Sequence, residues 1–183
     1  GRPATGNKGA CYLTLNGQNL VNTKDNQAIR LDPGATGLFA EYVRFENCPR
    51  SAIKVKNYYG ATSTLRLQTF RLNRCVFANT VRRESNTNTG SGGAIYVESY
   101  VNDANGNPHY VWMDELRLSN CTFDGCYAAE SGGAIGIYGI VKDINIATCQ
   151  FNGTYAKKNF GGAIAMAGHG STMTVTNTTF NNC

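Results

Sequence analysis

The sequence Gly-Gly-Ala-Ile occurs at residues 92–95, 132–135 and 161–164 of this 183-residue chain. Each copy follows a phenylalanine that belongs to a second repeated pattern. The phenylalanine anchors of this pattern are Phe45, Phe77, Phe123, Phe151 and Phe180. Two motifs that recur together along a chain are typical of solenoid proteins, in which each repeat stacks on its neighbours.

Short alternating apolar segments flank every anchor. Before the anchors stand the pairs Leu38/Ala40, Phe70/Leu72, Leu116/Leu118, Ile144/Ile146 and Met173/Val175, and after them stand Ala-Ile-x-apolar segments at 28–31, 52–55, 94–97, 134–137 and 163–166. Alternation with period two predicts strands with one buried face. Three short strands per repeat predict an all-β fold, a right-handed parallel β-helix of about six coils, with the anchor phenylalanines in one interior column. Leu20, preceded by Leu13 and Leu15, is the expected anchor of a degenerate first coil.

The residue two places after each anchor is always Asn or Gly. The six positions are Asn22, Asn47, Asn79, Gly125, Gly153 and Asn182. These two residue types tolerate a positive φ most readily. The column therefore predicts a tight left-handed corner between two strands of every coil.

Length and composition favour a single β-helix domain over residues 1–183, either a segment of a longer protein or a subunit that stacks end to end. Two irregular segments are expected, the loop excursion 98–115 and the stretch 80–91. No apolar run is long enough to span a membrane. The net charge of +5 indicates a solvated basic surface or a weak anion-binding face, with Arg82 and Arg83 among the outward arginines. No nucleic-acid-binding signature is present.

The seven cysteines follow the repeat rather than scattering through it. Cys75, Cys121 and Cys149 each stand two residues before an anchor, and Cys48, Cys126 and Cys183 each stand three after one. The first column is either a ladder of buried thiols or a site for a Cys75–Cys121 or Cys121–Cys149 disulfide. No Cys-x-x-Cys motif supports a zinc site, and we expect no metal or cofactor.

The paired motifs resemble the repeats of the chlamydial polymorphic outer membrane proteins over roughly residues 38–183. Those are autotransporter-type surface proteins with a β-helical passenger domain, and similar repeats occur in extracellular proteins of some protists and algae. This chain has Cys or Thr three residues after the anchor, where the family has Asn, which favours a eukaryotic extracellular relative. The resemblance implies surface display or adhesion without catalysis, outside the cell or at its surface, and anchored in the outer membrane if bacterial.

The expected function is therefore that of a non-catalytic surface β-helix, an adhesin passenger or a structural element of an appendage. The candidate contact residues, on the two irregular segments, are Tyr100, His109, Tyr110, Trp112, Arg82 and Arg83. They would meet a protein or glycan on another surface, whereas the open ends of the rod would meet further copies. Sequons at Asn120, Asn152 and Asn177 are candidate glycosylation sites in a eukaryote.

The alternative function is a polysaccharide lyase or hydrolase acting on acidic glycans. That chemistry needs carboxylates on adjacent coils. Glu46 and Asp124 share a column but are separated by Ala78, and we expect Asp103, Asp114 and Glu115 to lie within a single loop. We therefore expect no stacked carboxylates. The outward threonines also form no regular row of the kind that an ice-binding face needs.

Overall fold

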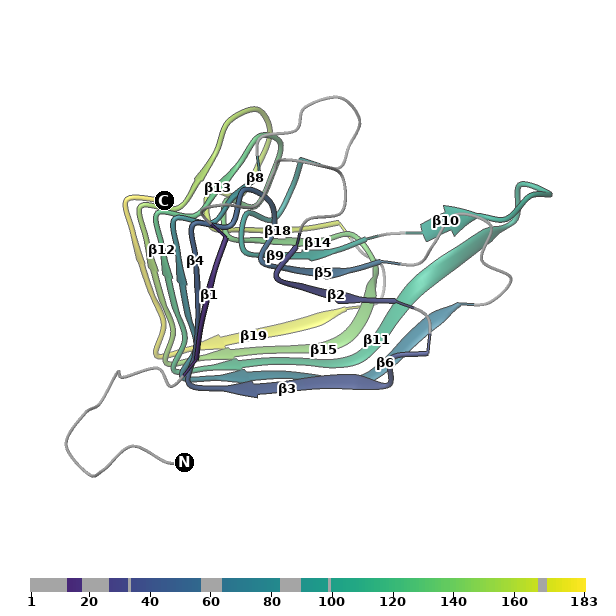
Figure 1. The fold of residues 1–183 in the computed structure, drawn as a ribbon, viewed down its shortest axis with the longest axis horizontal. Helices are drawn as coiled ribbons and strands as arrows, with labels where there is room; N and C mark the ends of the chain where they lie inside the picture. Colours follow the sequence, from purple (N-terminus) through teal and green to yellow (C-terminus); the bar gives the residue numbers. More distant parts are fainter. Residues whose placement is uncertain are drawn as a thin grey trace.

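The computed structural model describes residues 13–17, 27–32, 34–56, 64–82, 90–98, 100–167 and 171–183. All regular secondary structure in these ranges is β-strand. The sheets are parallel and their strands stack in chain order, with one antiparallel hairpin added (Figure 1). This all-β arrangement is that of a β-helix or solenoid, as the repeats predict.

Three larger sheets enclose the core. The anchor sheet contains β1 (Leu13–Asn16), β4 (Val43–Glu46), β7 (Val76–Ala78), β12 (Thr122–Asp124), β16 (Gln150–Asn152) and β20 (Thr179–Asn181). The long sheet contains β3 (Gly37–Glu41), β6 (Leu65–Asn73), β11 (Pro108–Ser119), β15 (Ile140–Ala147) and β19 (Thr172–Thr176). The Ala-Ile sheet contains β2 (Ile29–Leu31), β5 (Ile53–Val55), β9 (Ile95–Val97), β14 (Ile135–Ile137) and β18 (Ile164–Met166). A smaller sheet contains β8 (Val81–Arg82), β13 (Tyr127–Ala128) and β17 (Tyr155–Ala156).

The five anchor phenylalanines form one continuous stack. Their ring centroids are 4.6 to 4.9 Å apart, and neighbouring rings are within 7° of parallel. Phe45, Phe77, Phe123 and Phe151 are fully buried. The predicted interior column is therefore confirmed, and the apolar pairs of the long sheet are in register with one another as well.

The first coil is aligned differently from our prediction. Leu15, and not Leu20, is paired with Phe45, and Gly17 donates its backbone N–H to the carbonyl of Glu46. The prediction was wrong because Leu13 and Leu15 were assigned to the long sheet, although they belong to the anchor sheet. Asn22, the corner residue expected after Leu20, lies outside the described residues.

The predicted corner after each anchor is confirmed in the described coils. Asn47, Asn79, Gly125, Gly153 and Asn182 have φ values of 51° to 58°. The sequence did not reveal a second left-handed corner, three residues before each anchor. Its residues are Tyr42, Arg74, Asn120, Thr148 and Asn177, with φ values of 48° to 58°. Tyr42, Arg74 and Thr148 belong to residue types that rarely adopt this conformation, so the column lacks the Asn/Gly pattern that marked the first corner.

The cysteines next to the second corner act as hydrogen-bond donors. The thiols of Cys75, Cys121 and Cys149 lie 3.5, 3.3 and 3.4 Å from the carbonyl oxygen two residues earlier. Thr178 occupies the same position in the last coil, and its hydroxyl donates to Thr176 at 2.9 Å. The shared role of a thiol and a hydroxyl explains why this column accepts either residue type.

The column after the first corner works in the same way only in part. Thr80 donates its hydroxyl to the thiol of Cys126 on the next coil at 3.2 Å, and the buried hydroxyl of Thr154 has no hydrogen-bond partner among the described residues. Cys48 and Cys183 contact the carbonyl oxygens of Glu46 and Asn181 at 3.6 and 3.4 Å. The six cysteines that the structure describes are all free, and Cys11 lies outside the described residues. Of the two alternatives for Cys75, Cys121 and Cys149, the structure therefore contains the thiol ladder.

The two glycines of the Gly-Gly-Ala-Ile motif serve different purposes. The first, at Gly92, Gly132 and Gly161, has φ values of 61° to 69°, which favour glycine. The second permits close stacking: a Cβ atom on Gly133 would lie 2.1 Å from the carbonyl oxygen of Gly162 on the next coil. The alanine and isoleucine that follow point into the core, where Ala134 and Ile135 are fully buried.

The excursion 98–115 is more regular than predicted. It forms a hairpin arm, in which β10 (Tyr100–Asn102) pairs antiparallel with the start of β11 and projects beyond the stacked coils (Figure 1). The second half of the predicted loop is part of the 12-residue strand β11. The sequence concealed this strand because its outward residues Tyr110 and Trp112 are as apolar as the inward Val111 and Met113, so no alternation of polarity marks it.

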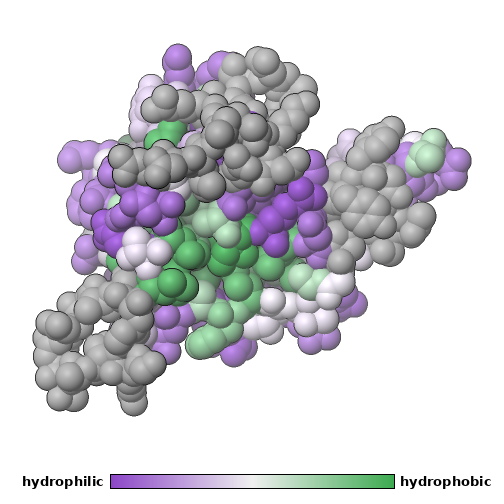
Figure 2. All heavy atoms as spheres, in the orientation of Figure 1, coloured by the Kyte–Doolittle hydropathy of each residue, from purple (hydrophilic) through white to green (hydrophobic). Residues whose placement is uncertain are grey.

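Hydrophobic side chains fill the space between the three large sheets. Figure 2 shows hydrophobic residues gathered near the centre of the molecule in this view, with hydrophilic residues around them. Apolar side chains are also exposed on the last coil, including Met173, Val175 and Phe180. The core is therefore a column that runs along the stack, bounded sideways by the sheets.

We predict that replacing Phe123 by Ala lowers the free energy of unfolding by about 3–5 kcal/mol, because the ring is buried between two stacked rings. Phe39→Ala is the matched control, since Phe39 lies on the outer face of β3 and is 69% exposed; its effect should stay below about 1 kcal/mol. Urea denaturation measures both. Equal losses in the two variants would show that the anchor column is not the core.

We also predict that the chain loses stability in alkaline solution. Burial raises the pKa of Cys48 to about 11 and that of Cys126 to about 12, from an ordinary 9.0. Between pH 9 and these values the unfolded chain releases protons that the folded chain retains, so the free energy of unfolding falls by up to about 1.4 kcal/mol per pH unit for each thiol. Cys126→Thr, which copies Thr80 and Thr154 in the same column, should lessen this slope in urea denaturation at a series of pH values. An unchanged slope would contradict the prediction.

Candidate functional site

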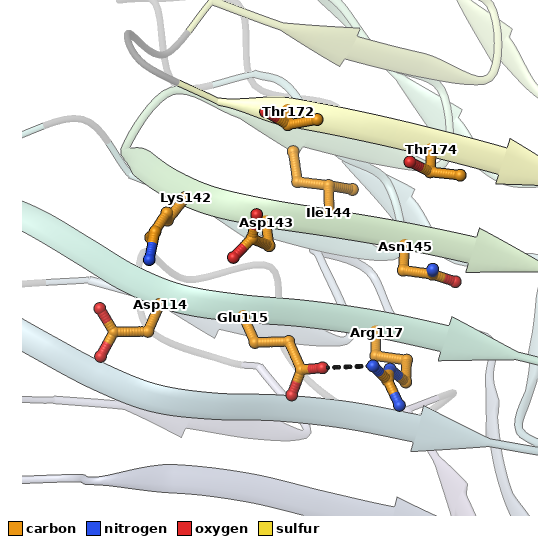
Figure 3. Close-up of a pocket in the computed structure, with 9 residues that line it drawn as sticks. All are labelled: Asp114, Glu115, Arg117, Lys142, Asp143, Ile144, Asn145, Thr172 and Thr174. Atoms are coloured by element: carbon orange, nitrogen blue, oxygen red, sulfur yellow. Dashed lines mark ion pairs between the residues drawn. The ribbon is translucent and has the colours of Figure 1, made fainter.

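A groove of about 400 Å³ lies on the outer face of the long sheet (Figure 3). Three neighbouring strands line it. β11 contributes Asp114, Glu115 and Arg117, β15 contributes Lys142, Asp143, Ile144 and Asn145, and β19 contributes Thr172 and Thr174. Polar and charged side chains thus converge on one surface from successive coils.

A shared bend in the strands brings these charged residues together. Buried and outward residues alternate along β6, β11 and β15, except that two consecutive residues point outward at one place in each strand. In β11 these are Asp114 and Glu115, and in β15 they are Lys142 and Asp143. The bends of β11 and β15 are adjacent because Glu115 pairs with Asp143.

Two arginines hold Glu115 in place. Arg71 on β6 lies 2.6 Å from one carboxylate oxygen, and Arg117 lies 2.8 Å from the other. Charge-assisted hydrogen bonds of this length are strong and directional. Because both carboxylate oxygens are engaged, Glu115 orients the guanidinium of Arg117 at the groove.

Asp114 belongs to a second network, at the base of the hairpin arm. It accepts hydrogen bonds from Arg66 at 3.1 Å and from the indole N–H of Trp112 at 3.0 Å. These contacts, with Arg66 the largest contribution, lower the pKa of Asp114. The guanidinium of Arg66 also lies 6.0 Å from the centre of the Trp112 ring, within the range of a cation–π contact.

Lys142 and Asp143 are exposed, and neither makes a hydrogen bond or ion pair with any residue that the structure describes. Figure 3 shows both side chains extending over the groove between β11 and β15. They are therefore the charged groups at this site that are available to a ligand.

The expectation that no carboxylates stack on adjacent coils is corrected here. Glu115 and Asp143 are direct neighbours in register on β11 and β15. Sequence reasoning missed Asp143, although a signal was present: each carboxylate immediately precedes the first residue of an apolar pair, Leu116 or Ile144. Glu46 and Asp124 are separated by Ala78, as predicted.

The hairpin arm exposes two of the predicted contact residues side by side. Tyr100 and Tyr110 are cross-strand neighbours, with ring centroids 5.7 Å apart, and are 48% and 42% exposed. His109 is partly buried and lies 3.4 Å from Asp103 in the turn. Asp103 also accepts three hydrogen bonds from Asn105 and Asn107, and those from Asn107 contribute most to lowering its pKa to about 2.

Trp112 connects the arm to the groove. Its side chain is partly buried, and it lies on the same strand as Tyr110 and Asp114 at intervals of two residues. Side chains spaced by two residues share one face of a strand. The aromatic residues of the arm and the charged groove thus form one surface along β11, which we call the β11 face.

The structure corrects the prediction that Arg82 points outward. Arg82 is 1% exposed, and its guanidinium lies 4.3 Å from the centre of the Tyr96 ring and donates to the hydroxyl of Ser51 at 2.9 Å. Burial lowers the pKa of Arg82 to about 10. Arg82 was predicted to be outward as a charged residue on an irregular segment, but Tyr96 on the outer side of β9 provides an aromatic surface that covers its guanidinium. Arg83 lies outside the described residues.

The three sequons occupy different environments. Asn120 and Asn177 are exposed left-handed corner residues, and Asn120 donates to Asn73 at 3.1 Å. Asn152 is partly buried and accepts a hydrogen bond from Asn181 at 2.9 Å. Use of any of them for glycosylation stays a prediction.

Comparison with known proteins adds no relative: no family model, no curated protein and no solved structure matches the chain. The described residues include no helix with the length and hydrophobicity needed to cross a membrane. Within the same ranges, no three His, Cys, Asp or Glu side chains gather in a group that could hold a metal ion.

We predict that Arg82→Ala lowers the free energy of unfolding by about 2–4 kcal/mol, because it removes a buried side chain from Tyr96 and Ser51. Arg117→Ala, at an exposed ion pair, should cost less than about 1 kcal/mol. Urea denaturation at neutral pH compares the two variants. A smaller loss for Arg82 than for Arg117 would contradict the buried position of Arg82.

Proposed function

We propose that this chain is a non-catalytic extracellular or cell-surface protein, an adhesin passenger or a structural element of an appendage, built as a right-handed β-helix of about six coils. It meets a protein or glycan on another surface through the β11 face. One observation carries this proposal: the hairpin arm exposes a pair of tyrosines, and the strand that holds Tyr110 also contributes residues to the charged groove.

The chemistry of the β11 face supports a binding role. Exposed tyrosines and a tryptophan provide large, rigid contact surfaces that lose little conformational entropy on binding. On the same surface, Arg66, Arg71 and Arg117 form ion pairs with Asp114 or Glu115, and Arg66 also lies over the Trp112 ring. A rigid stack of sheets presents such a surface without rearrangement, which favours binding because no ordering cost is added.

The last coil provides a second proposed contact, either with further coils of a longer chain or with further copies of this chain. Phe180 is 46% exposed, and no described strand covers β20 on its outer side. Uncovered strand edges can pair with another chain. Either contact would extend the anchor column beyond Phe180.

The alternative function is a lyase or hydrolase acting on acidic polysaccharides. The neighbouring carboxylates of Glu115 and Asp143 are the specific observation that favours it, because acid–base chemistry needs two carboxyl groups across one bond. Both carboxylate oxygens of Glu115 are already engaged by arginines, which leaves them less available to a substrate. Turnover of polygalacturonate that disappears in both Glu115→Gln and Asp143→Asn would establish the enzymatic function in place of the binding one.

We predict that the double variant Tyr100→Ala/Tyr110→Ala lowers binding at least about ten-fold, because each ring buries apolar area at a contact. The measurement is binding of the fluorescently labelled chain to a glycan array and to cultured cell monolayers. Tyr155→Ala is the matched control, since Tyr155 is 55% exposed on β17, outside the β11 face. Thermal unfolding confirms that all variants are folded. Equal losses in the double variant and the control, or absence of binding by the unaltered chain, would overturn the proposal.

A further inference from the structure

We propose that the groove on the β11 face binds an acidic sugar, a hexuronate unit within a glycan chain. Its carboxylate would meet Lys142, and its hydroxyl groups would meet Asp143, Asn145 and the threonines of β19. This inference rests on the proposed binding function and names the ligand class of the same surface.

The charge balance of the surface favours a ligand with one negative charge. Arg66, Arg71 and Arg117 are each engaged with a carboxylate of Asp114 or Glu115, so these five groups form closed networks. The groove lining itself contains two cations, Arg117 and Lys142, and three carboxylates. With Arg66 and Arg71, which pair with two of these carboxylates from outside the lining, the surface carries four cations and three carboxylates. A ligand that brings one carboxylate neutralises it, and the compact ammonium of Lys142 is suited to that carboxylate because no described residue forms an ion pair with it.

The remaining lining groups suit sugar hydroxyls. Asp143 provides only acceptors, whereas Asn145, Thr172 and Thr174 provide both donors and acceptors. A pyranose ring presents hydroxyl groups that donate and accept in the same way. Arg117 adds guanidinium donors whose direction is fixed by Glu115.

The dimensions of the groove agree with an extended chain of sugars. Its volume of about 400 Å³ lies within the range of small-molecule sites. Asp114, which lines the groove, accepts a hydrogen bond from Trp112, and Tyr110 of the tyrosine pair lies further along the same strand. The rings of these residues can stack against the apolar faces of neighbouring sugars. One unit in the groove would thus place the next units towards the arm.

Isothermal titration calorimetry of the full chain with tetragalacturonate tests this inference, and the methyl-esterified tetramer serves as the matched neutral ligand. We expect Lys142→Met to weaken binding of the acid at least ten-fold and to leave binding of the ester unchanged. Asp143→Ala should weaken both ligands alike, because it removes a hydroxyl acceptor. Lys157→Met, at an exposed lysine outside the groove, should alter neither.

Several outcomes would overturn the inference. These are equal affinity for the acid and the ester, no effect of Lys142→Met, or no binding of the acid at all. Displacement of the tetramer by inorganic phosphate at matched ionic strength would show a general anion site instead of a uronate site. If the groove variants have no effect while Tyr100→Ala/Tyr110→Ala still abolishes binding to cells, the ligand assignment fails and the proposed surface function stands.

Discussion

The left-handed corners on either side of the anchor strand constrain the rest of this structure. Parallel strands stay in register over many coils only if every coil turns at equivalent places. A residue with positive φ makes each turn sharp. At the corners before Cys121 and Thr178, the thiol or hydroxyl of the residue that follows the corner donates to the carbonyl of the residue that precedes it. With both corners fixed, the phenylalanine between them has one direction available, which is inward onto the ring of the neighbouring coil.

The sequence predicted those parts of the fold in which a residue type is restricted by its backbone or its burial. The anchor column, the Asn/Gly corner and the apolar pairs were recognisable because few residues can replace Phe123, Asn79 or Ile144 there. The corner at Tyr42, Arg74 and Thr148 was not recognisable, because the fold imposes positive φ on residues that do not prefer it. The first coil was misplaced because Leu13 and Leu15 fit the apolar pattern of both the long sheet and the anchor sheet. Only the pairing with β4 shows that they belong to the anchor sheet.

The candidate site was less predictable, because it depends on contacts between coils. Tyr100 and Tyr110 were predicted as contact residues from their residue type. That they lie side by side could not be predicted, because it depends on the antiparallel pairing of β10 with β11. Asp143 is recognisable as a site residue only from the pairing of β11 with β15, which places it beside Glu115. Arg82 was misassigned because its residue type suggests a surface position, and the sequence does not show that a tyrosine on another strand covers the guanidinium. Charged residues in a β-helix therefore need the register of the neighbouring coils before their role can be judged.

The corner hydrogen bonds have a consequence for how such a chain can change in length. The thiols of Cys75, Cys149 and Cys183 lie within hydrogen-bond distance of a carbonyl oxygen of their own coil, two residues earlier. Thr80 instead bonds to Cys126 on the next coil, and no disulfide joins the described coils. A coil therefore carries its own turning elements and shares no covalent cross-link with the next. Duplication or deletion of one repeat in the gene would leave the corners of the remaining coils intact, so recombination could lengthen or shorten the rod in whole steps while the surface at a given coil evolved separately.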